Sequence, residues 1–362
     1  MEQSTLRGCR DASRRLVAAR PPATFAAPES PEPTGDSRVE PVVLIVTVRN
    51  EARTIGPLLD SILAGTRVPD EIVVADGGSS DGTLELLRSR ASADPRIRAV
   101  LAPGNRSVGR NAAVRASTAP IVACTDAGVE VEPDWLERIT RPFAADPATE
   151  VVAGFYLPVG RTRFERAAGV ISAPRLTEID PKRFLPSTRS VAFRRTAWER
   201  VRGFDESLAH NEDTPFALAL KAAGARFHFE PEARVRWHPR GDLRSFFRQH
   251  RRFGFGDGES RVQGSFYARL AAKYALGAIL FVGGFWYRDC WAALVVGLLL
   301  FVTTQARRGA GKLGPYGRFI LVPFLKVVYD AAYLSGYAQG RLSRLSSPGR
   351  PLRDRDSPRA SD

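Results

Sequence analysis

The stretch DEIVVADGGSSDGT, residues Asp70–Thr83, decides the fold of this chain. Its β-branched run at residues 72–74 is typical of a strand that is buried on both faces. The strand leads into Asp76 and then into the glycine- and serine-rich segment 77–82, which only a tight turn accommodates. A helical pattern of leucines begins at Thr83. The carboxylate of Asp76 is therefore expected at the carboxyl end of a parallel strand, where open α/β sheets bind their ligands.

The same order of strand, turn and helix repeats through the first part of the chain. Buried strands are expected at Val42–Val48, Glu71–Ala75, Ile97–Leu101 and Pro120–Thr125, with helices between them. This alternation predicts an α/β fold with a mostly parallel central sheet and helices on both faces. Later strands are expected at Thr149–Leu157, Ser190–Arg194 and Arg226–Phe229. Residues 158–190 contain several prolines and are expected to be irregular.

The net charge of +14 is concentrated in the last third of the chain. Residues 1–233 carry equal numbers of acidic and basic side chains, so the whole excess lies beyond them, beside the most apolar segments. This position indicates a membrane surface as the partner rather than nucleic acid, for which no recognition motif is present. The three cysteines form no CxxC pair, which excludes a disulfide framework or a cysteine-rich zinc site and suits a reducing compartment.

An apolar segment, Tyr274–Gln305, carries only two charged residues, Arg288 and Asp289, in its middle. One helix of this length would run about 48 Å, against a hydrocarbon core of roughly 30 Å, and would bury both charges. A transmembrane hairpin over residues 266–306 instead puts this pair at an interface among aromatic residues. The basic residues near its two ends then predict that the remainder of the chain faces the cytoplasm. A buried hairpin in a soluble protein is the alternative.

The remaining segments complete the expected domain organisation. Residues 1–40 lack a sustained apolar run and predict a disordered leader, and residues 342–362 predict a disordered tail. Residues 315–341 are apolar but contain Pro323, Lys326 and Asp330, which favours an amphipathic helix on the membrane surface over a third span. The α/β domain is expected over residues 41–260.

Four blocks in order resemble the family 2 glycosyltransferases of the GT-A fold. They are VTVRNEARTIGPLLDSIL, DEIVVADGGSSDGT, CTDAGVEVEPDWL and GFDESLAHNEDTPFALALKAAG, within about residues 42–260. A fifth block, RQHRRFGFGDG, resembles the arginine-aromatic-glycine segment that these enzymes often carry. The resemblance implies a GT-A nucleotide-sugar-binding fold, and many membrane-bound members end in a transmembrane hairpin.

The resemblance implies a donor site for a nucleotide diphosphate sugar. Asp76 resembles the aspartate that contacts the nucleotide base or ribose, and Glu51 the acidic residue that helps to hold the nucleoside. Arg110 and Asn111 resemble a segment that lines the donor site. Arg251 and Arg252 are expected to close over the diphosphate, with a role at the membrane surface as the alternative.

The resemblance also implies a divalent cation, Mg²⁺ or Mn²⁺, and a catalytic base. Asp126 matches the first carboxylate of the DxD metal motif, but the next residues are Ala127 and Gly128, so the second aspartate is missing. Asp126 then binds the cation alone with phosphate oxygens and water, or with help from Glu130. His238 is a further candidate ligand. In the pair Glu212 and Asp213, Asp213 matches the catalytic base.

These features predict a membrane-anchored glycosyltransferase that moves a sugar from a nucleotide diphosphate donor to a lipid-linked or cell-envelope glycan acceptor. Direct displacement by a base-activated acceptor predicts inversion at the anomeric carbon. Two alternatives stay open: a non-catalytic membrane-anchored scaffold that binds a nucleotide sugar, and a nucleotidyltransferase on a similar sheet. The segment RNEAR after the first strand lacks the glycine-rich phosphate loop that a nucleotidyltransferase requires.

Overall fold

One mixed sheet organises the computed structural model, which describes residues 40–345. Its strand order is β3-β2-β1-β4-β7-β6-β8-β5. The strands are β1 (Val42–Val48), β2 (Glu71–Asp76), β3 (Ile97–Leu101), β4 (Ile121–Asp126), β5 (Val129–Val131), β6 (Val151–Pro158), β7 (Val191–Arg194) and β8 (Phe227–Trp237). The expected leader, apart from Glu40, and residues 346–362 of the expected tail lie outside the described residues.

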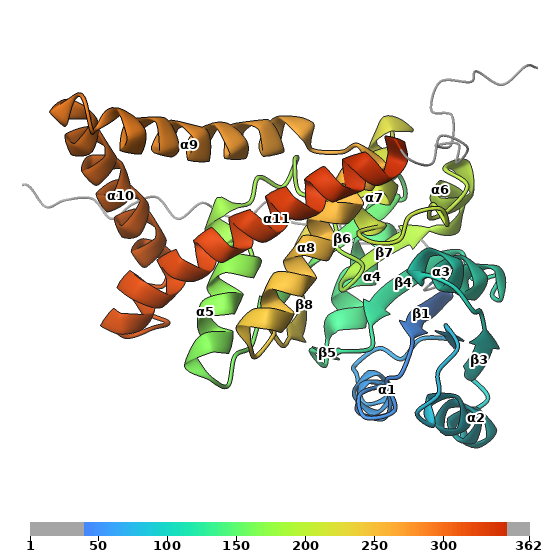
Figure 1. The fold of residues 1–362 in the computed structure, drawn as a ribbon. Helices are drawn as coiled ribbons and strands as arrows, with labels where there is room; N and C mark the ends of the chain where they lie inside the picture. The colour runs from blue at the N-terminus through green and yellow to red at the C-terminus, as the bar shows by residue number, and fades with distance from the viewer. Residues whose placement is uncertain (1–39, 346–362) are drawn as a thin grey trace, which may run out of the picture. The chain divides into compact units, whose positions relative to one another are not determined.

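The first four strands form the predicted parallel part of the sheet. Strand β1 pairs in parallel with β2 and β4, and β2 pairs in parallel with β3 (Figure 1). Alternate residues of β1 are buried on opposite faces of the sheet. On one face, Leu44 and Val46 pack with helices α1 (Ile55–Leu63), α2 (Thr83–Ala93) and α4 (Trp135–Ala145). Val43 and Ile45 pack with α3 (Arg106–Arg115), α6 (Arg195–Arg200) and α7 (Asp213–Ala222). Both faces of the parallel part are therefore covered, which explains its unbroken β-branched runs.

The other half of the sheet is mixed in direction. Strand β7 is antiparallel to β4 and β6, whereas β8 is parallel to β6 and antiparallel to β5. Strand β8 continues well beyond the expected end at Phe229, because Ala233, Val235 and Trp237 alternate with the arginines at 234 and 236 and bury one face. The α/β fold class is confirmed, with a parallel half joined to a mixed half.

Residues 158–190 are more regular than expected. They contain helix α5 (Arg163–Ser172) and the short 3-10 helix η1 (Leu176–Glu178), so the expectation of a wholly irregular segment is wrong. Thr162 caps α5: its side chain accepts a hydrogen bond from the Glu165 backbone, and the Glu165 side chain accepts one from the Thr162 backbone. This capping box starts a helix between two prolines, and Ala168 and Ile171 then bury its inner face.

Long helices follow the sheet. They are α8 (Leu243–Ser260), α9 (Gly264–Gly283), α10 (Arg288–Arg308), the short π-helix η2 (Gly317–Leu321) and α11 (Val322–Leu345). Helix α11 packs along α8 (Figure 1). A methyl group at Gly336 would lie 2.0 Å from the backbone oxygen of Arg251, and one at Gly254 would lie 2.3 Å from that of Tyr333. With Gly258 and Gly340, each helix presents a glycine every fourth residue, the small-residue pattern that allows close helix crossings.

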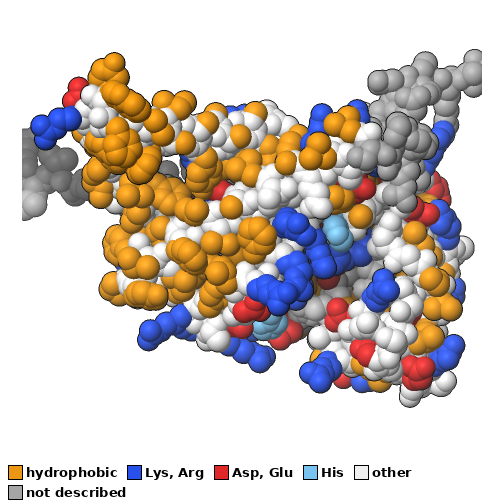
Figure 2. Space-filling model, in the orientation of Figure 1, with side chains coloured by type: hydrophobic (Ala, Val, Ile, Leu, Met, Phe, Trp, Pro, Cys, Tyr) orange, Lys and Arg blue, Asp and Glu red, His pale blue; other side chains and the backbone are white. Residues whose placement is uncertain are grey.

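Three of these helices are long and apolar enough to cross a membrane: α9, α10 and the segment Gly317–Leu345. Figure 2 shows hydrophobic side chains gathered over this part of the molecule. Most of the large apolar side chains of α9 and α10 are exposed, including Ile279, Phe281 and Leu299. Such a surface is far more apolar than water-facing helices tolerate, which supports membrane association. The domain boundaries given above remain predictions.

A charged cluster joins two of the apolar helices. The fully buried Asp330 of α11 accepts a hydrogen bond from Lys273 Nζ of α9 at 2.8 Å and forms an ion pair with Lys326 of its own helix. The hydroxyl of Tyr274 donates to the same carboxylate at 2.9 Å. Every charge in the cluster is paired, so it fixes α9 against α11 without an isolated charge in an apolar setting.

Candidate active site

Two carboxylates end the strands that flank β1 in the parallel part of the sheet. Asp76 ends β2 in register with Val48, and Asp126 ends β4 in register with Thr47, with β1 between them. Since adjacent strands lie about 4.8 Å apart, the two residues are separated by about 10 Å at the same edge of the sheet. This is the edge at which the sequence predicts ligand binding.

Asp76 is fully buried, and only one of its carboxylate oxygens has a partner. Oδ1 accepts hydrogen bonds from the backbone N–H groups of Gly78 and Ser79, both at 2.7 Å. Oδ2 has no hydrogen-bond partner among the described residues. A buried acceptor without a partner is costly, so this oxygen is suited to a donor group of a ligand, such as a base N–H or a ribose hydroxyl.

The loop after β1 is tied to the Asp76 turn. The Asn50 side chain accepts from the Ser80 backbone at 2.8 Å, and the Glu51 backbone N–H donates to Thr83 Oγ1 at 2.9 Å. Glu51 is partly buried and lies close enough to Arg240 to act on its pKa, although burial is the main cause that lowers the pKa of Arg240. Glu51 is thereby held at the same edge of the sheet as Asp76.

Arg110 of α3 joins the acidic residues of the site. Its side chain is 1% exposed and forms an ion pair with Glu212 through Nη1. Nη2 donates to Asp126 Oδ1 at 3.1 Å and to Thr188 Oγ1 at 2.9 Å. Burial is the largest single influence and opposes the charge of Arg110, but the surrounding anionic groups, Glu212 foremost and Asp126 among them, together outweigh it and raise the pKa of the guanidinium. Three segments far apart in the sequence therefore meet at one buried cation.

Arg189 approaches Asp126 from the mixed half of the sheet. Its guanidinium lies 5.2 Å from the ring centroid of Tyr156 and 4.9 Å from that of Trp237. Its Nε lies 3.9 Å from Asp126 Oδ2, so both oxygens of this carboxylate face a guanidinium. Burial raises the pKa of Asp126. The positive charges around it, chiefly those of Arg110 and Arg189, together lower the pKa by more than burial raises it, so the net pKa is below its ordinary value. Asp126 is thus held ionised.

Glu212 and Asp213 occupy different environments although they are adjacent. Burial is the largest single influence and raises the pKa of Glu212, but Arg110, Arg106 and the hydrogen bonds to the carboxylate together outweigh it, so the net pKa is lowered. Asp213, the first residue of α7, is only partly exposed, and its Oδ1 accepts a hydrogen bond from the Thr214 backbone at 3.0 Å. Burial and then the neighbouring Glu212 charge raise the pKa of Asp213. The charged form is therefore favoured at Glu212, and of the two carboxylates Asp213 is the one that takes up a proton more readily.

Helix α8 supports the loop that carries these two acids. Asn211, which has a φ of +57°, donates through Nδ2 to Asp257 Oδ1 at 2.6 Å. The hydroxyl of Tyr267 on α9 donates to the other oxygen of Asp257 at 2.6 Å. Glu259 Oε2 accepts from the Ala209 backbone at 2.9 Å. The position of Asp213 is consequently linked through α8 to the first apolar helix.

Further arginines surround the acidic centre. Arg106 lies close enough to affect the pKa of Asp126, Glu212 and His210, and Arg252 also acts on His210. Burial is the main cause that lowers the pKa of His210, followed by the positive charges of Arg252 and Arg106. Figure 2 shows Lys and Arg side chains gathered at the middle of this face. The site therefore combines carboxylates with an excess of cations.

Asn111 and Arg251, predicted to bind the donor, have other contacts in the structure. Asn111 is fully buried and uses both ends of its amide to bind the segment 198–206: Nδ2 donates to the Phe204 oxygen, and Oδ1 accepts from the Phe204 N–H, both at 2.9 Å. Arg251 donates to Gln339 of α11 at 3.3 Å. Asn111 therefore orders the chain leading to the acid pair, and Arg251 contacts α11.

The three predicted metal ligands are not gathered in one cluster. Glu130 Oε1 lies 3.1 Å from His238 Nε2, and the other ring nitrogen of His238 lies 3.2 Å from the Val159 oxygen. No group of three or more His, Cys, Asp or Glu side chains within residues 40–345 could hold a metal ion. Of the three predicted ligands, Asp126 is the one that binds Arg110, the same guanidinium that pairs with Glu212. A cation here would need oxygen ligands from a substrate as well.

Several residues of the site escaped the sequence analysis. Thr188 and Arg189 precede strand β7 in a segment that carries no local pattern, and Arg106 and Arg240 stand outside every block. Their contacts join residues far apart in the sequence, so no spacing rule could have found them. Asp257 falls within the fifth block, which was noted for its arginines and glycines.

Comparisons with known proteins agree with this geometry. Residues 43–208 match the family model described as Glycosyl transferase family 2. The succinoglycan biosynthesis protein ExoA of Rhizobium meliloti is 29% identical over 60% of this chain and 69% of its own length. The pre-mycofactocin glycosyltransferase of Mycobacterium tuberculosis is 30% identical over 64% of this chain and 49% of its own length.

A solved structure shares the fold. The mannosyltransferase PcManGT from Pyrobaculum calidifontis, in complex with GDP-Man and Mn²⁺, has a TM-score of 0.59 and 22% identity over 83% of this chain and 89% of its own. At this identity the likeness establishes the fold. Together, the family match, the relatives and the shared fold show that this chain carries a family 2 glycosyltransferase domain, within residues 43–208, and has a fold like that of the GT-A glycosyltransferases.

Proposed function

We propose that this enzyme transfers a sugar from a nucleotide diphosphate donor to a lipid-linked or cell-envelope glycan acceptor, with inversion at the anomeric carbon. The observation that carries the proposal is the convergence of Asp126, Glu212 and Asp213 around the buried Arg110. Asp126 ends a parallel strand, and the acid pair opens a helix nearly ninety residues later. Folding brings them together at the edge where such sheets bind nucleotides.

The nucleoside of the donor would bind at the Asp76 turn. Asp76 Oδ2 is the buried acceptor without a partner, and the adjacent Glu51 adds a second carboxylate at this edge. Both are suited to the N–H groups of a base or the hydroxyls of a ribose. The diphosphate would then extend toward Asp126, about two strands away, where Arg106, Arg189 and Arg252 supply positive charge.

The donor set at Asp126 fits a divalent cation that is shared with the diphosphate. Asp126 is ionised and its side chain is 34% exposed, so it retains lone pairs for a cation although arginines also face it. Mg²⁺ and Mn²⁺ commonly use one or two carboxylates together with substrate phosphates. When bound, the cation would supply Lewis-acid neutralisation of the leaving diphosphate. Glu130 and His238 remain predicted ligands, and in the structure these two side chains contact each other.

Asp213 would deprotonate the acceptor hydroxyl as it attacks the anomeric carbon. Its pKa is raised by burial and by Glu212, which brings the carboxylate closer to the basicity that proton abstraction requires. Glu212 has a different role: it neutralises Arg110 and orients the start of α7. Attack from the side opposite the leaving diphosphate is a single displacement, and this step inverts the anomeric configuration.

The apolar helices would anchor the enzyme with its catalytic domain facing the cytoplasm. Lys and Arg side chains lie in the domain-side halves of α9 and α10: Arg269, Lys273, Arg307 and Arg308. The opposite end of α10 begins with one charge of each sign, Arg288 and Asp289. A bias of Lys and Arg toward one side favours the cytoplasmic orientation of that side. Cytoplasmic nucleotide sugars and membrane-embedded acceptors would both reach a site in this arrangement.

Donor binding by the full chain tests this proposal. A panel of nucleotide diphosphate sugars with Mn²⁺ should include one that raises the melting temperature of the wild type. Asp76→Asn replaces the unpartnered acceptor by a donor and should weaken that nucleotide at least tenfold. Asp60→Asn, at an exposed salt bridge with Arg90, is the control and should bind normally. Equal binding by Asp76→Asn would refute the assignment of the nucleoside site.

A further inference from the structure

The loop that leads to the acid pair is held by two helices, α3 and α8. Residues 205–211, which we call the acid loop, form turns and bends without a helix or strand and run directly into the acid pair at 212–213. From one side, Asn105 Nδ2, at the start of α3, donates to the backbone oxygens of Glu206 at 2.7 Å and of Leu208 at 3.0 Å. From the other side, the acid loop contacts the end of α8. The direction in which the acid pair points therefore depends on both helices.

Asn211, the last residue of the acid loop, has an unusual backbone conformation. Its φ of +57° lies in the left-handed region, which asparagine tolerates better than most residues. Asn211 comes directly before Glu212, so a change in this conformation redirects the chain that enters α7. The hydrogen bond that Asn211 Nδ2 donates to Asp257 Oδ1, at 2.6 Å, holds the conformation in place.

The backbone of α8 lies directly against the acid loop. A methyl group at Gly256 would lie 2.3 Å from the His210 backbone oxygen and 2.7 Å from Asn211 Cβ. Both distances are shorter than a methyl carbon can approach such atoms, so the helix and the loop touch without any spare room. A displacement of α8 is therefore passed on to the acid loop.

Asp257, the next residue of α8, joins the acid loop to the first apolar helix. It is 2% exposed, and its second oxygen accepts a hydrogen bond from the hydroxyl of Tyr267 on α9 at 2.6 Å. A buried carboxylate between two donors holds both of them, because loss of either donor leaves the charge less well paired. Burial raises the pKa of Asp257 and the charge of Asp213 adds to this rise, so the two carboxylates lie close enough to interact.

Tyr267 is itself fixed by the apolar helices. It is 2% exposed, and its ring stacks on that of Tyr337 of α11, with the centroids 3.9 Å apart and an angle of 11° between the ring planes. Further along α9, Lys273 binds Asp330 of α11. The hydroxyl of Tyr267 therefore reaches α8 while α9 lies in this place against α11.

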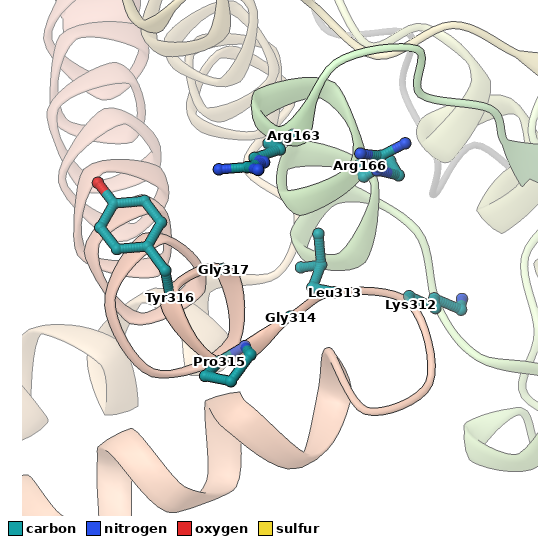
Figure 3. Close-up of a pocket in the computed structure, with 8 residues that line it drawn as sticks. All are labelled: Arg163, Arg166, Lys312, Leu313, Gly314, Pro315, Tyr316 and Gly317. Carbon is teal, nitrogen blue, oxygen red and sulfur yellow. The ribbon is translucent and has the colours of Figure 1, made fainter.

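Helix α11 packs closely on the end of α8 beside the acid loop. A methyl group at Gly258 would lie 2.3 Å from the Tyr337 backbone oxygen, and one at Gly340 would lie 2.1 Å from that of Phe255. The chain that enters η2 and α11 is less closely packed, because a cavity of about 270 Å³ lies between α5 and residues 312–317 (Figure 3). The position of this end of α8 therefore depends on the second half of α11 rather than on its start.

We propose that Asp257 is a positioning residue for Asp213, and that its hydrogen bond from Tyr267 makes the position of this base depend on the seating of α9 against α11. The inference rests on the proposed function, which assigns Asp213 as the base. Asp257 acts through Asn211, which directs the chain into α7, and not on the substrate. The apolar helices thereby do more than anchor the enzyme, since displacement of α9 moves the base. A misplacement of about 1 Å lowers a rate by about 10²-fold.

Hydrogen exchange of the acid loop tests the link to α9 without any substrate. The full chain in phosphatidylcholine nanodiscs is compared as wild type, Tyr267→Phe and Tyr337→Phe. Tyr267→Phe keeps the stacked ring and removes the hydroxyl bonded to Asp257, so the backbone amides at 209–214 should exchange about tenfold faster. Tyr337→Phe removes the hydroxyl from the other ring of the stack and should exchange as the wild type. Wild-type exchange in Tyr267→Phe, or equally fast exchange in Tyr337→Phe, would overturn the link to α9.

Turnover tests the positioning role. Hydrolysis of UDP-glucose and of GDP-glucose with Mn²⁺ uses water as the acceptor and gives kcat and KM. Asn211→Gly allows the same φ without the side chain, and Asp257→Ala removes the partner of that side chain. Both variants should lower kcat by about 10²-fold and change KM by less than about twofold, because the donor binds to other elements. Asp257→Asn keeps an oxygen for Asn211 and should restore kcat to within about fivefold of the wild type.

Two results would overturn the positioning role: a wild-type kcat in Asn211→Gly, or a higher KM at unchanged kcat. If the wild type hydrolyses neither sugar, the exchange of the amides at 209–214 in Asn211→Gly and Asp257→Ala decides, and wild-type exchange in both overturns the role. Asp213→Asn in the same assay separates the two proposals. A wild-type rate in Asp213→Asn means that the proposed function fails in its base. A slow Asp213→Asn beside a fast Asp257→Ala means that this inference alone fails.

Discussion

Replacement of Asp213 by Asn separates catalysis from folding. The variant keeps the side-chain oxygen that accepts from the Thr214 N–H, and removes a carboxylate whose pKa is raised by burial and Glu212. A positioned general base contributes about 10²–10⁴-fold to a rate, equal to about 3–5 kcal/mol of activation free energy. We therefore expect Asp213→Asn to lower the transfer rate by this factor while donor affinity stays unchanged.

The same variant should be more stable than the wild type at neutral pH. The pKa of Asp213 is raised in the folded state, so the ionised carboxylate lowers the free energy of unfolding. The wild type therefore loses stability as the pH rises through the raised pKa. The melting temperature of Asp213→Asn should thus exceed that of the wild type at pH 7.5. The difference should vanish below about pH 3.9, where the unfolded carboxyl is also protonated.

Glu212→Gln is the matched comparison, one residue away and with the opposite expectation. It leaves Arg110, 1% exposed, without its main counter-charge, although Asp126 and Thr188 remain. Removal of one partner of a buried pair costs about 3–5 kcal/mol. For a domain of this size that corresponds to a melting temperature lower by about 6–20 °C.

The assay combines initial transfer rates, donor titration by calorimetry and thermal melts of both variants in the same detergent. Asp213→Asn with more than a tenth of the wild-type rate would refute its role as the base. A fall in melting temperature as large as that of Glu212→Gln would refute the division of roles between the two acids.

Three further substitutions test other parts of the molecule. Asp126→Asn should weaken donor binding in Mn²⁺ but not in EDTA, as measured by calorimetry, and equal weakening in both would contradict a shared cation. Burial raises the pKa of Asp257 to about 6, so Asp257→Asn should gain melting temperature relative to wild type as the pH rises from 4 through 6. A difference that is constant over this range would contradict the pKa. Asp330→Asn leaves Lys273 and Lys326 unpaired and should destabilise the protein in detergent by about 3–5 kcal/mol. The exposed Asp289→Asn is its control, and equal melting temperatures would contradict a structural role for the cluster.

The parallel part of the sheet could be predicted because its signal is local. The bounds expected for β1 and β3 agree with the structure, since β-branched runs between turn residues identify buried strands. The signal weakens after β4, where strands run in both directions. Strand β8 runs past its expected end at Phe229, and the alternation that ends at Trp237 is present in the sequence.

Helix α5 was missed for a different reason. Prolines dominated the interpretation of residues 158–190, whereas the pair Thr162 and Glu165 is a capping box that marks a helix start. The pattern was available and would have placed the helix. By contrast, the close packing of α8 on α11 depends on glycines separated by about eighty residues, so a local sequence pattern does not predict this packing.

The site was predictable only where residues belong to a recognisable block. Asp76, Asp126 and Glu212 fall within such blocks, and the structure brings Asp126 and Glu212 to the same guanidinium of Arg110. Arg189 has no such block, because its place depends on two aromatic rings from other strands. Glu130 was predicted as a metal ligand because it lies four residues after Asp126, and His238 because histidine commonly binds metals. The structure does not gather the three side chains in one cluster.

The most direct measurement is a structure of the full chain with its nucleotide diphosphate sugar and Mn²⁺. The account predicts the nucleoside hydrogen-bonded to Asp76 Oδ2, the diphosphate between Asp126 and the surrounding arginines, and the Asp213 carboxylate on the side of the sugar opposite the leaving group. A donor bound at another surface, or an Asp213 carboxylate turned away from the anomeric carbon, would contradict it.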